Sequence, residues 1–278
     1  MPMRRGERVE IVPASPFDVR EFARSAVGSH RDELRLTEYD ESPLSRETLR
    51  CLRYIRDVER STMRYLRRVL VTPTHKDAYV TAFLTTWAYE KYWIADALDA
   101  VIERHGYPIQ ASRSRPANTA AAWRRAQERF APIGRSIVDN TIGDAVIAVH
   151  MTTSTIDEWM THAAYERIAE LEEHKELTRT VERFLDIKSR HLAFFIAQSR
   201  NRLRRSRLAR RLARTRLRRS LWPLSVEDEP IAEESFFFGR IFASAPSLIE
   251  EIDRRVQALP GLGRLTLVHA TVAARRHI

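Results

Sequence analysis

The hydrophobic pattern in the first half of the chain predicts a helical hairpin. Apolar side chains recur at three- and four-residue steps along residues 46–70, and the same spacing returns along residues 78–105. Gly106 is placed to end the second helix. The turn-forming stretch "TPTHKD" separates the two segments, and because this connection is short we predict that the helices pack side by side and antiparallel.

The same pattern returns later in the chain. Residues 144–173 and 177–203 both carry apolar side chains at helical spacing, and the turn "HKE" lies between them. A further helical stretch is expected around residues 120–130, and strand signals are nearly absent. We therefore expect an all-α fold, a helical bundle built from two long antiparallel hairpins with extra helices.

Each predicted hairpin carries an acid on its first helix and a lysine on its second, inside the apolar stripes. The midpoint between Glu59 and Lys91 falls in "TPTHKD", and the midpoint between Glu158 and Lys188 falls at the "EEHKE" turn. Residues equidistant from the turn of an antiparallel pair lie at the same height, so each hairpin should bring its acid level with its lysine. Glu166 is the alternative acid for the third helix, but its midpoint with Lys188 lies beyond the turn.

Lysine is rare in this chain, which gives the two central lysines weight. Only Lys76, Lys91, Lys175 and Lys188 are lysines among the 47 basic residues. A lone buried ammonium group would cost several kcal/mol or lose its proton, whereas one beside a carboxylate can be paired. We interpret Lys91 with Glu59, and Lys188 with Glu158, as buried ion pairs.

These positions match the ligand spacing of di-iron helical bundles, in which Glu-x-x-His places two ligands on one helical face. The segments "DVERSTMRYLRRVLVTPTHKD", "TAFLTTWAYEKYW", "IDEWMTHAAY", "DIKSRHLAFF" and "IDRRVQALPGL", across roughly residues 50–262, resemble the ferritin-like superfamily, near the acyl carrier protein desaturases and desaturase-like actinobacterial proteins. In those relatives the second motif reads Trp-x-x-Glu-Glu-x-x-His and the fourth helix carries Glu-x-x-His. By that resemblance Glu90 keeps the first Glu of the second motif, whereas Lys91 and Ile94 replace its second Glu and its His. Lys188 replaces the Glu of the fourth helix, and His191 is retained.

The resemblance implies a ferritin-like bundle that has lost its di-iron centre. Four carboxylates balance two divalent ions, and two carboxylates balance two ammonium groups, so either arrangement is neutral. We therefore expect no metal cofactor and a core network of Lys91, Lys188, Glu59, Glu158 and His191 as the candidate catalytic set. The alternative is an iron site on Glu59, Glu158 and His191, since two carboxylates and a histidine form a recognised iron triad, although two neighbouring ammonium groups would oppose it.

Two functions follow as expectations. The first is a metal-independent protein of secondary or lipid metabolism, either an enzyme that uses lysine and carboxylate chemistry or a non-catalytic carrier or partner subunit. The second is an iron-dependent, oxygen-activating desaturase or hydroxylase with a degraded site. The expected partners are an acyl-type small molecule or an acidic carrier protein, and the chain could also form a homodimer.

The charge of the chain is concentrated in one segment. The net charge is +10, and residues 200–219 hold eleven arginines and no acid. On a continuous helical wheel Leu203, Leu217 and Leu221 lie opposite Leu208 and Leu212, so no single basic face is predicted. Binding of nucleic acid through these arginines is therefore only a third, weaker function hypothesis, and the resemblance to the desaturases offers docking of an acidic acyl carrier protein as another interpretation of the segment. The favoured interpretation is a solvated, kinked or half-buried helix, partly neutralised by acids that follow it, namely Glu227, Asp228, Glu229, Glu233 and Glu234.

The remaining features bound the class of protein. With a single cysteine, Cys51, no apolar run near the roughly 20 residues that cross a bilayer and no secretory segment at the start, we expect a cytoplasmic protein without disulfides. We divide the chain into an arm (residues 1–45), the bundle (residues 46–222) and a C-terminal extension (residues 223–278). The aromatics of the central helices are expected to pack inside the bundle, namely Trp87, Tyr89, Tyr92, Trp93 and Trp159.

Overall fold

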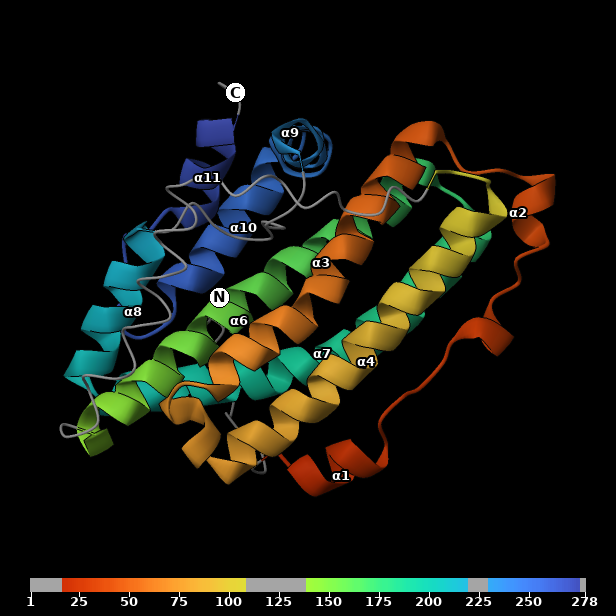
Figure 1. Ribbon diagram of the computed structural model, residues 1–278. Coiled ribbons are helices and arrows are strands. Elements are labelled where there is room, and N and C mark those ends of the chain that lie inside the picture. The colour runs from red at the N-terminus through yellow and green to blue at the C-terminus, as the bar shows by residue number, and fades with distance from the viewer. Residues whose placement is uncertain (1–16, 109–138, 220–229, 276–278) are drawn as a thin grey trace, which may run out of the picture.

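The computed structural model describes residues 17–108, 139–219 and 230–275, and all of the regular structure in these ranges is helical. The prediction of an all-α bundle is confirmed for this part of the chain. Four long helices, α3, α4, α6 and α7, lie side by side (Figure 1), and shorter helices pack on their outer faces. The predicted helix around residues 120–130 lies outside the described residues.

The first two long helices form a hairpin at the predicted place. Helix α3 (Arg46–Leu70) begins where the Ser45 side chain accepts a hydrogen bond from the backbone N–H of Thr48. A short turn, η2 (Pro73–Lys76), leads to α4 (Ala78–Arg104), whose N-cap Asp77 accepts from Val80 N–H. Helix α4 ends just before Gly106, which adopts a φ of +59°, a left-handed conformation that glycine adopts at little cost.

The second hairpin consists of α6 (Asp139–Glu172) and α7 (Lys175–Arg205), which pack along their lengths. The chain reverses through Glu173, which has a φ of +52°, and His174, whose side chain caps α7 by accepting from Leu177 N–H. The other nitrogen of the His174 ring bonds to the carbonyl of Ser42. These contacts fix the turn, and with it the register of α6 against α7.

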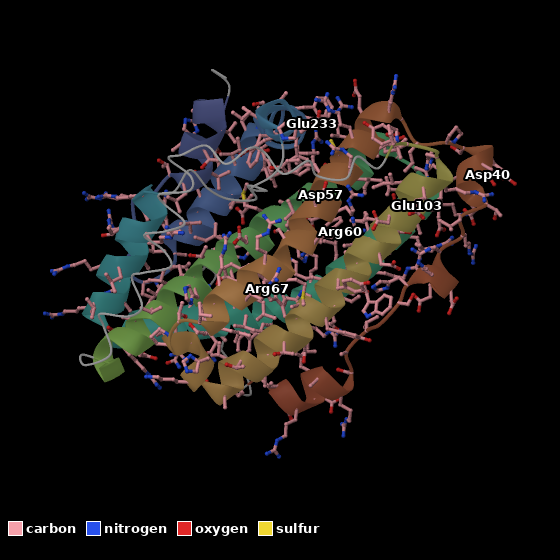
Figure 2. All side chains as sticks on the ribbon, in the orientation of Figure 1. Asp40, Asp57, Arg60, Arg67, Glu103 and Glu233 are labelled. Carbon is pink, nitrogen blue, oxygen red and sulfur yellow. The ribbon has the colours of Figure 1, made fainter. Side chains whose placement is uncertain are left out.

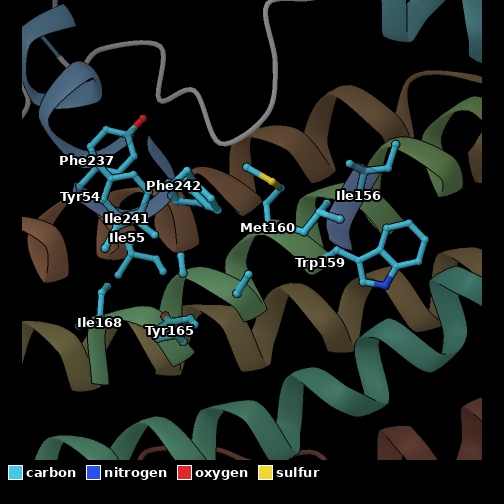
Figure 3. Packing of buried hydrophobic residues seen from close by; sticks show 14 of the residues in the cluster. Tyr54, Ile55, Ile156, Trp159, Met160, Tyr165, Ile168, Phe237, Ile241 and Phe242 are labelled. Atoms are coloured by element: carbon cyan, nitrogen blue, oxygen red, sulfur yellow. The ribbon is translucent and has the colours of Figure 1, made fainter. Parts of the chain in front are cut away.

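Two apolar clusters fill the interior. The larger one joins α3 and α6 to the C-terminal helices, and Figure 3 shows Tyr54 and Ile55 facing Phe237, Ile241 and Phe242 across this junction. The smaller one is aromatic, and it joins the N-terminal part of α4 to α7 and α1 through Phe22, Phe83, Trp87, Phe194 and Phe195. Four charged side chains, Glu59, Lys91, Glu158 and Lys188, are buried inside the bundle as well.

The residues before α3 lie along the bundle in a series of short elements. They form α1 (Val19–Arg24), η1 (Arg31–Glu33) and α2 (Glu38–Glu41), and α1 packs on α4. Arg31 makes a bidentate contact with Asp96 of α4, and the backbone N–H of Arg35 bonds to the buried carboxylate of Glu176 on α7. In the described part, residues 17–45 are therefore an arm tied to both hairpins.

After α7 the chain continues as α8 (Arg207–Arg219), α9 (Ile231–Phe238), η3 (Gly239–Ala243), α10 (Pro246–Gln257) and α11 (Leu267–Arg275). Helix α8 packs on α6, and α9 packs on α3. No helix within the described ranges combines the length and the apolar content needed to cross a bilayer. Cys51 is buried and has a free thiol.

Two expectations about surface residues need correction. Tyr89 and Tyr92 are 46% and 54% exposed, because they lie on the outward side of α4, whereas Trp87 and Trp159 are buried. Glu233 does not neutralise the arginine-rich segment, because its carboxylate binds Arg50 and Arg53 of α3. Glu233 is labelled in Figure 2. Three of the other acids proposed for that role, Glu227, Asp228 and Glu229, lie outside the described residues.

Candidate functional site

Four charged side chains meet at the centre of the bundle, one from each long helix. Glu59 comes from α3, Lys91 from α4, Glu158 from α6 and Lys188 from α7. Each is buried, and the side chains of Glu59, Glu158 and Lys188 are fully shielded from solvent. We call these four residues the Glu/Lys ring.

The ring is closed, because each ammonium group contacts both carboxylates. Lys91 Nζ lies 2.8 Å from Glu59 Oε2 and 3.3 Å from Glu158 Oε1. Lys188 Nζ lies 3.0 Å from Glu59 Oε1 and 2.9 Å from Glu158 Oε2. The contacts within each hairpin are those that the sequence spacing predicts, and the contacts between the hairpins complete the ring. All four carboxylate oxygens are therefore in contact with an ammonium group.

Two aromatic side chains add hydrogen bonds to the ring. Trp87 Nε1 donates to Glu158 Oε1 at 2.9 Å, and the Tyr165 hydroxyl donates to Glu59 Oε1 at 3.2 Å. The lysine nitrogens also lie near these rings, Lys91 at 5.0 Å from the centroid of Trp87 and Lys188 at 5.7 Å from that of Tyr165. Neither donor is predicted from the sequence. Their spacing was a usable signal, since Trp87 precedes Lys91 by one helical turn and Tyr165 follows Glu158 by two.

Burial and pairing act in opposite directions on the acids of the ring. Burial raises the pKa of Glu59 and Glu158, but the charges of Lys188 and Lys91 outweigh it and hold both pKa values below 4.5, the usual value. Burial alone would lower the pKa of Lys91, yet the charges of Glu158 and Glu59 raise it above 10.5. Burial raises the pKa of the Tyr165 hydroxyl, and the neighbouring Glu59 raises it further. Glu59, Glu158 and Lys91 are therefore held in their charged forms, and Lys188 Nζ lies between the same two carboxylates.

His191 lies beside the ring but is bonded elsewhere. Its Nε2 atom is 2.6 Å from Glu90 Oε2, and both side chains are fully buried. The other Glu90 oxygen accepts from Arg190 at 2.6 Å and from the backbone N–H of Val27 at 2.9 Å. The expectation that His191 belongs to the core network thus needs refinement, because its hydrogen bond runs to Glu90 and, through Glu90, to the arm. Burial lowers the pKa of His191, although the bond to Glu90 opposes this shift.

The choice between the two candidate acids on α6 is decided by burial. Glu158 is fully buried, whereas the side chain of Glu166 is 54% exposed and lies 3.8 Å from His162, one turn earlier on the same helix. Glu158 is therefore the acid of the third long helix. Ile94, which stands where the resemblance expects a histidine, is fully buried in apolar surroundings.

The residues present do not fit a di-iron centre. Every carboxylate oxygen of the ring is within 3.3 Å of an ammonium nitrogen, so a divalent cation would have to displace a charge of the same sign. The imidazole of His191 has its Nε2 atom on Glu90, and its buried Nδ1 atom has no hydrogen-bond partner among the described residues. Within the described ranges no three His, Cys, Asp or Glu side chains are arranged to hold a metal ion.

The geometry also limits what the lysines can do chemically. A lysine acts as a nucleophile or as a base only when its amine is neutral. Lys91 is held in its charged form, and both ammonium groups are enclosed by two carboxylates. The arrangement is suited to holding four helices in one register.

Comparison with known proteins adds no assignment. No protein-family model, curated protein or solved structure matches this chain.

Proposed function

We propose that this chain is a ferritin-like protein of desaturase-like descent in which the Glu/Lys ring stands in the place of a di-iron centre. We further propose that it works without metal, as a non-catalytic carrier or partner subunit in lipid or secondary metabolism. The observation that carries the first proposal is the pairing of all four carboxylate oxygens with two buried ammonium groups. The metabolic setting rests on the resemblance of the motifs.

The ring supports a non-catalytic function over lysine chemistry. Its four side chains are at most 5% exposed, so a substrate would reach them only after the helices had separated. Removing one partner of a buried ion pair costs about 3–5 kcal/mol. A reaction that removed the charge from either lysine would destabilise the protein by a similar amount in every catalytic cycle.

The descent from a di-iron protein can be tested by rebuilding the ligand set. The triple variant Lys91→Glu, Ile94→His, Lys188→Glu would present Glu and Glu-x-x-His groups at the six positions that the resemblance implies. We expect the wild-type protein, expressed with added iron, to contain well below one iron per chain by elemental analysis. We expect the triple variant to contain about two.

The matched control changes Lys175, a lysine of α7 that lies outside the ring. Lys175→Glu adds the same kind of charge on exposed α7 surface and should leave the metal content unchanged. About two irons in the wild-type protein would contradict the proposal and favour an iron-dependent enzyme. A folded triple variant, checked by circular dichroism, that binds no iron would contradict the descent from a di-iron bundle.

A further inference from the structure

The arginine-rich segment is not one continuous helix. Helix α7 ends at Arg205, Ser206 adopts an extended conformation with φ −127° and ψ 120°, and α8 begins at Arg207. The Ser206 hydroxyl then accepts a hydrogen bond from Ala209 N–H. The break separates Leu203 of α7 from the leucines of α8, so one continuous helical wheel does not describe the whole segment.

Helix α8 has one buried side. Ala209, Ala213 and Leu217 are buried against the bundle at four-residue steps, and Leu208 and Leu212 are half-buried on the flank. The opposite side carries Arg207, Arg211 and Arg218, all exposed. At about 100° per residue these three arginines fall within a stripe about 40° wide and about 16 Å long.

Two other arginines of α8, Arg210 and Arg214, have structural roles. Arg210 donates to the carbonyls of Leu203 and Arg204 in the last turn of α7. Arg214 donates to the carbonyls of Gly261 and Gly263 at 3.1 and 3.2 Å, which ties the loop after α10 to α8. These contacts leave the outward stripe to Arg207, Arg211 and Arg218.

The same loop brings one more arginine to this side of the molecule. Arg264 directly follows Gly263, is exposed and has a φ of +68°, a conformation uncommon for a residue with a side chain. Because the Gly263 carbonyl is bonded to Arg214, the backbone of Arg264 lies next to α8. We call Arg207, Arg211, Arg218 and Arg264 the arginine face. Helix α8 lies at the outer edge of the bundle (Figure 1).

Among the described residues, the arginine face has no acidic partner and no apolar centre. None of its four arginines forms an ion pair with a residue that the structure describes, whereas the exposed Arg31, Arg104 and Arg254 do. Within the described residues, α8 exposes no large apolar side chain. Such a surface attracts anions but has no hydrophobic anchor for a protein partner.

We infer that the arginine face binds the phosphate backbone of double-helical nucleic acid without preference for sequence. Guanidinium groups contact phosphates through two parallel hydrogen bonds, and release of counterions from the duplex supplies affinity without apolar contact. A membrane-surface helix would insert its apolar side, but that side of α8 is buried against α6. Binding of single strands uses exposed aromatic side chains, which α8 does not carry.

The test is fluorescence anisotropy of a labelled 20-base-pair duplex at several salt concentrations. We expect the wild-type protein to bind, with log K falling linearly as log salt rises. The variant in which Arg207, Arg211, Arg218 and Arg264 are all replaced by Gln should bind at least about tenfold more weakly at low salt. Its salt slope should be shallower by up to about 3.6, because each phosphate contact contributes about 0.9.

The control removes the same charge from other surfaces. Arg20, Arg46, Arg67 and Lys175 are exposed and lie outside α8, and Arg67 is labelled on α3 in Figure 2. Replacing these four by Gln lowers the net charge equally and should change the duplex affinity by less than about threefold. Equal losses in the two variants, or no binding by the wild-type protein at low salt, would overturn the inference. So would tighter binding to anionic phospholipid vesicles or to a single strand of the same length.

Discussion

The Glu/Lys ring and the arginine face place positive charge in opposite environments. In the ring, two lysines are buried and each contacts two carboxylates within 3.3 Å. On the arginine face, four guanidinium groups are exposed and have no acidic partner among the described residues. The first arrangement stabilises the fold at one point, and the second leaves charge available to an external partner.

The comparison shows why lysine occupies the centre of a chain in which arginine predominates. An ammonium group is a compact charge with three donors, so it can lie between two carboxylates in the volume left between four helices. A guanidinium group is planar and larger, and it suits flat anions at a surface. Arg56 is a buried exception, and its guanidinium group pairs with two carboxylates, Asp57 of α3 and Asp99 of α4.

The largest effect that separates the two regions is expected from Lys188→Met. This change leaves Glu59 and Glu158 with one ammonium group between them, and an uncompensated buried charge costs about 3–5 kcal/mol. Chemical denaturation should show a loss of this size in the free energy of unfolding. Lys175→Met, on the exposed surface of the same helix, is the matched control and should change it by less than about 0.5 kcal/mol.

The loss should be recovered when the ring is neutralised completely. Combining Lys188→Met with Lys91→Met, Glu59→Gln and Glu158→Gln removes all four charges and keeps acceptors for Trp87 and Tyr165. We expect this quadruple variant to be more stable than Lys188→Met alone. If it were less stable, the charge balance of the ring would not be its stabilising feature.

The next effect is the pH dependence of the ring. The folded protein holds the pKa of Glu59 and Glu158 below 4.5, so their stabilising contribution is complete above that pH. As the pH falls below 4.5 the unfolded chain binds the protons first, and stability should decline by up to about 1.4 kcal/mol per pH unit for each carboxyl group. On the alkaline side the raised pKa of Lys91 keeps its contribution intact until the pH exceeds 10.5. Denaturation midpoints between pH 2 and pH 7 should therefore fall more steeply in the wild-type protein than in the quadruple variant.

The smallest effect concerns the support of the arginine face. Gly261 has a φ of +81°, and a Cβ added there would lie 2.5 Å from Arg210 Cδ and 2.8 Å from its Cβ. Gly261→Ala should lower the free energy of unfolding by about 1–3 kcal/mol, because both the backbone and the packing against α8 would be strained. Gly263→Ala is the control, since an added Cβ there meets nothing within 4 Å. Equal thermal stability of the two variants would show that the loop does not support α8.

Some parts of the site could be predicted because they depend on local geometry. Two helices joined by a short turn must be antiparallel, so the spacing of Glu59 and Lys91, and of Glu158 and Lys188, from their turns set their heights. The apolar stripes set which face of each helix is buried. These two constraints explain why the four members of the ring could be named from the sequence.

Other parts depend on contacts between segments that are distant in the chain, and no local pattern encodes them. The bond from His191 to Glu90 requires α4 and α7 to be neighbours, and the bond from Val27 to Glu90 requires the arm to lie over both. The direction of the exposed arginines depends on the extended conformation of Ser206, which changes the phase between α7 and α8. The sequence alone determined the two hairpins, and it determined that an acid and a lysine lie at the same height in each hairpin. Two helices joined by a short turn fix both of these features locally. The tertiary structure alone decided how the two hairpins close the ring and where the remaining charges point, because those depend on how the helices pack.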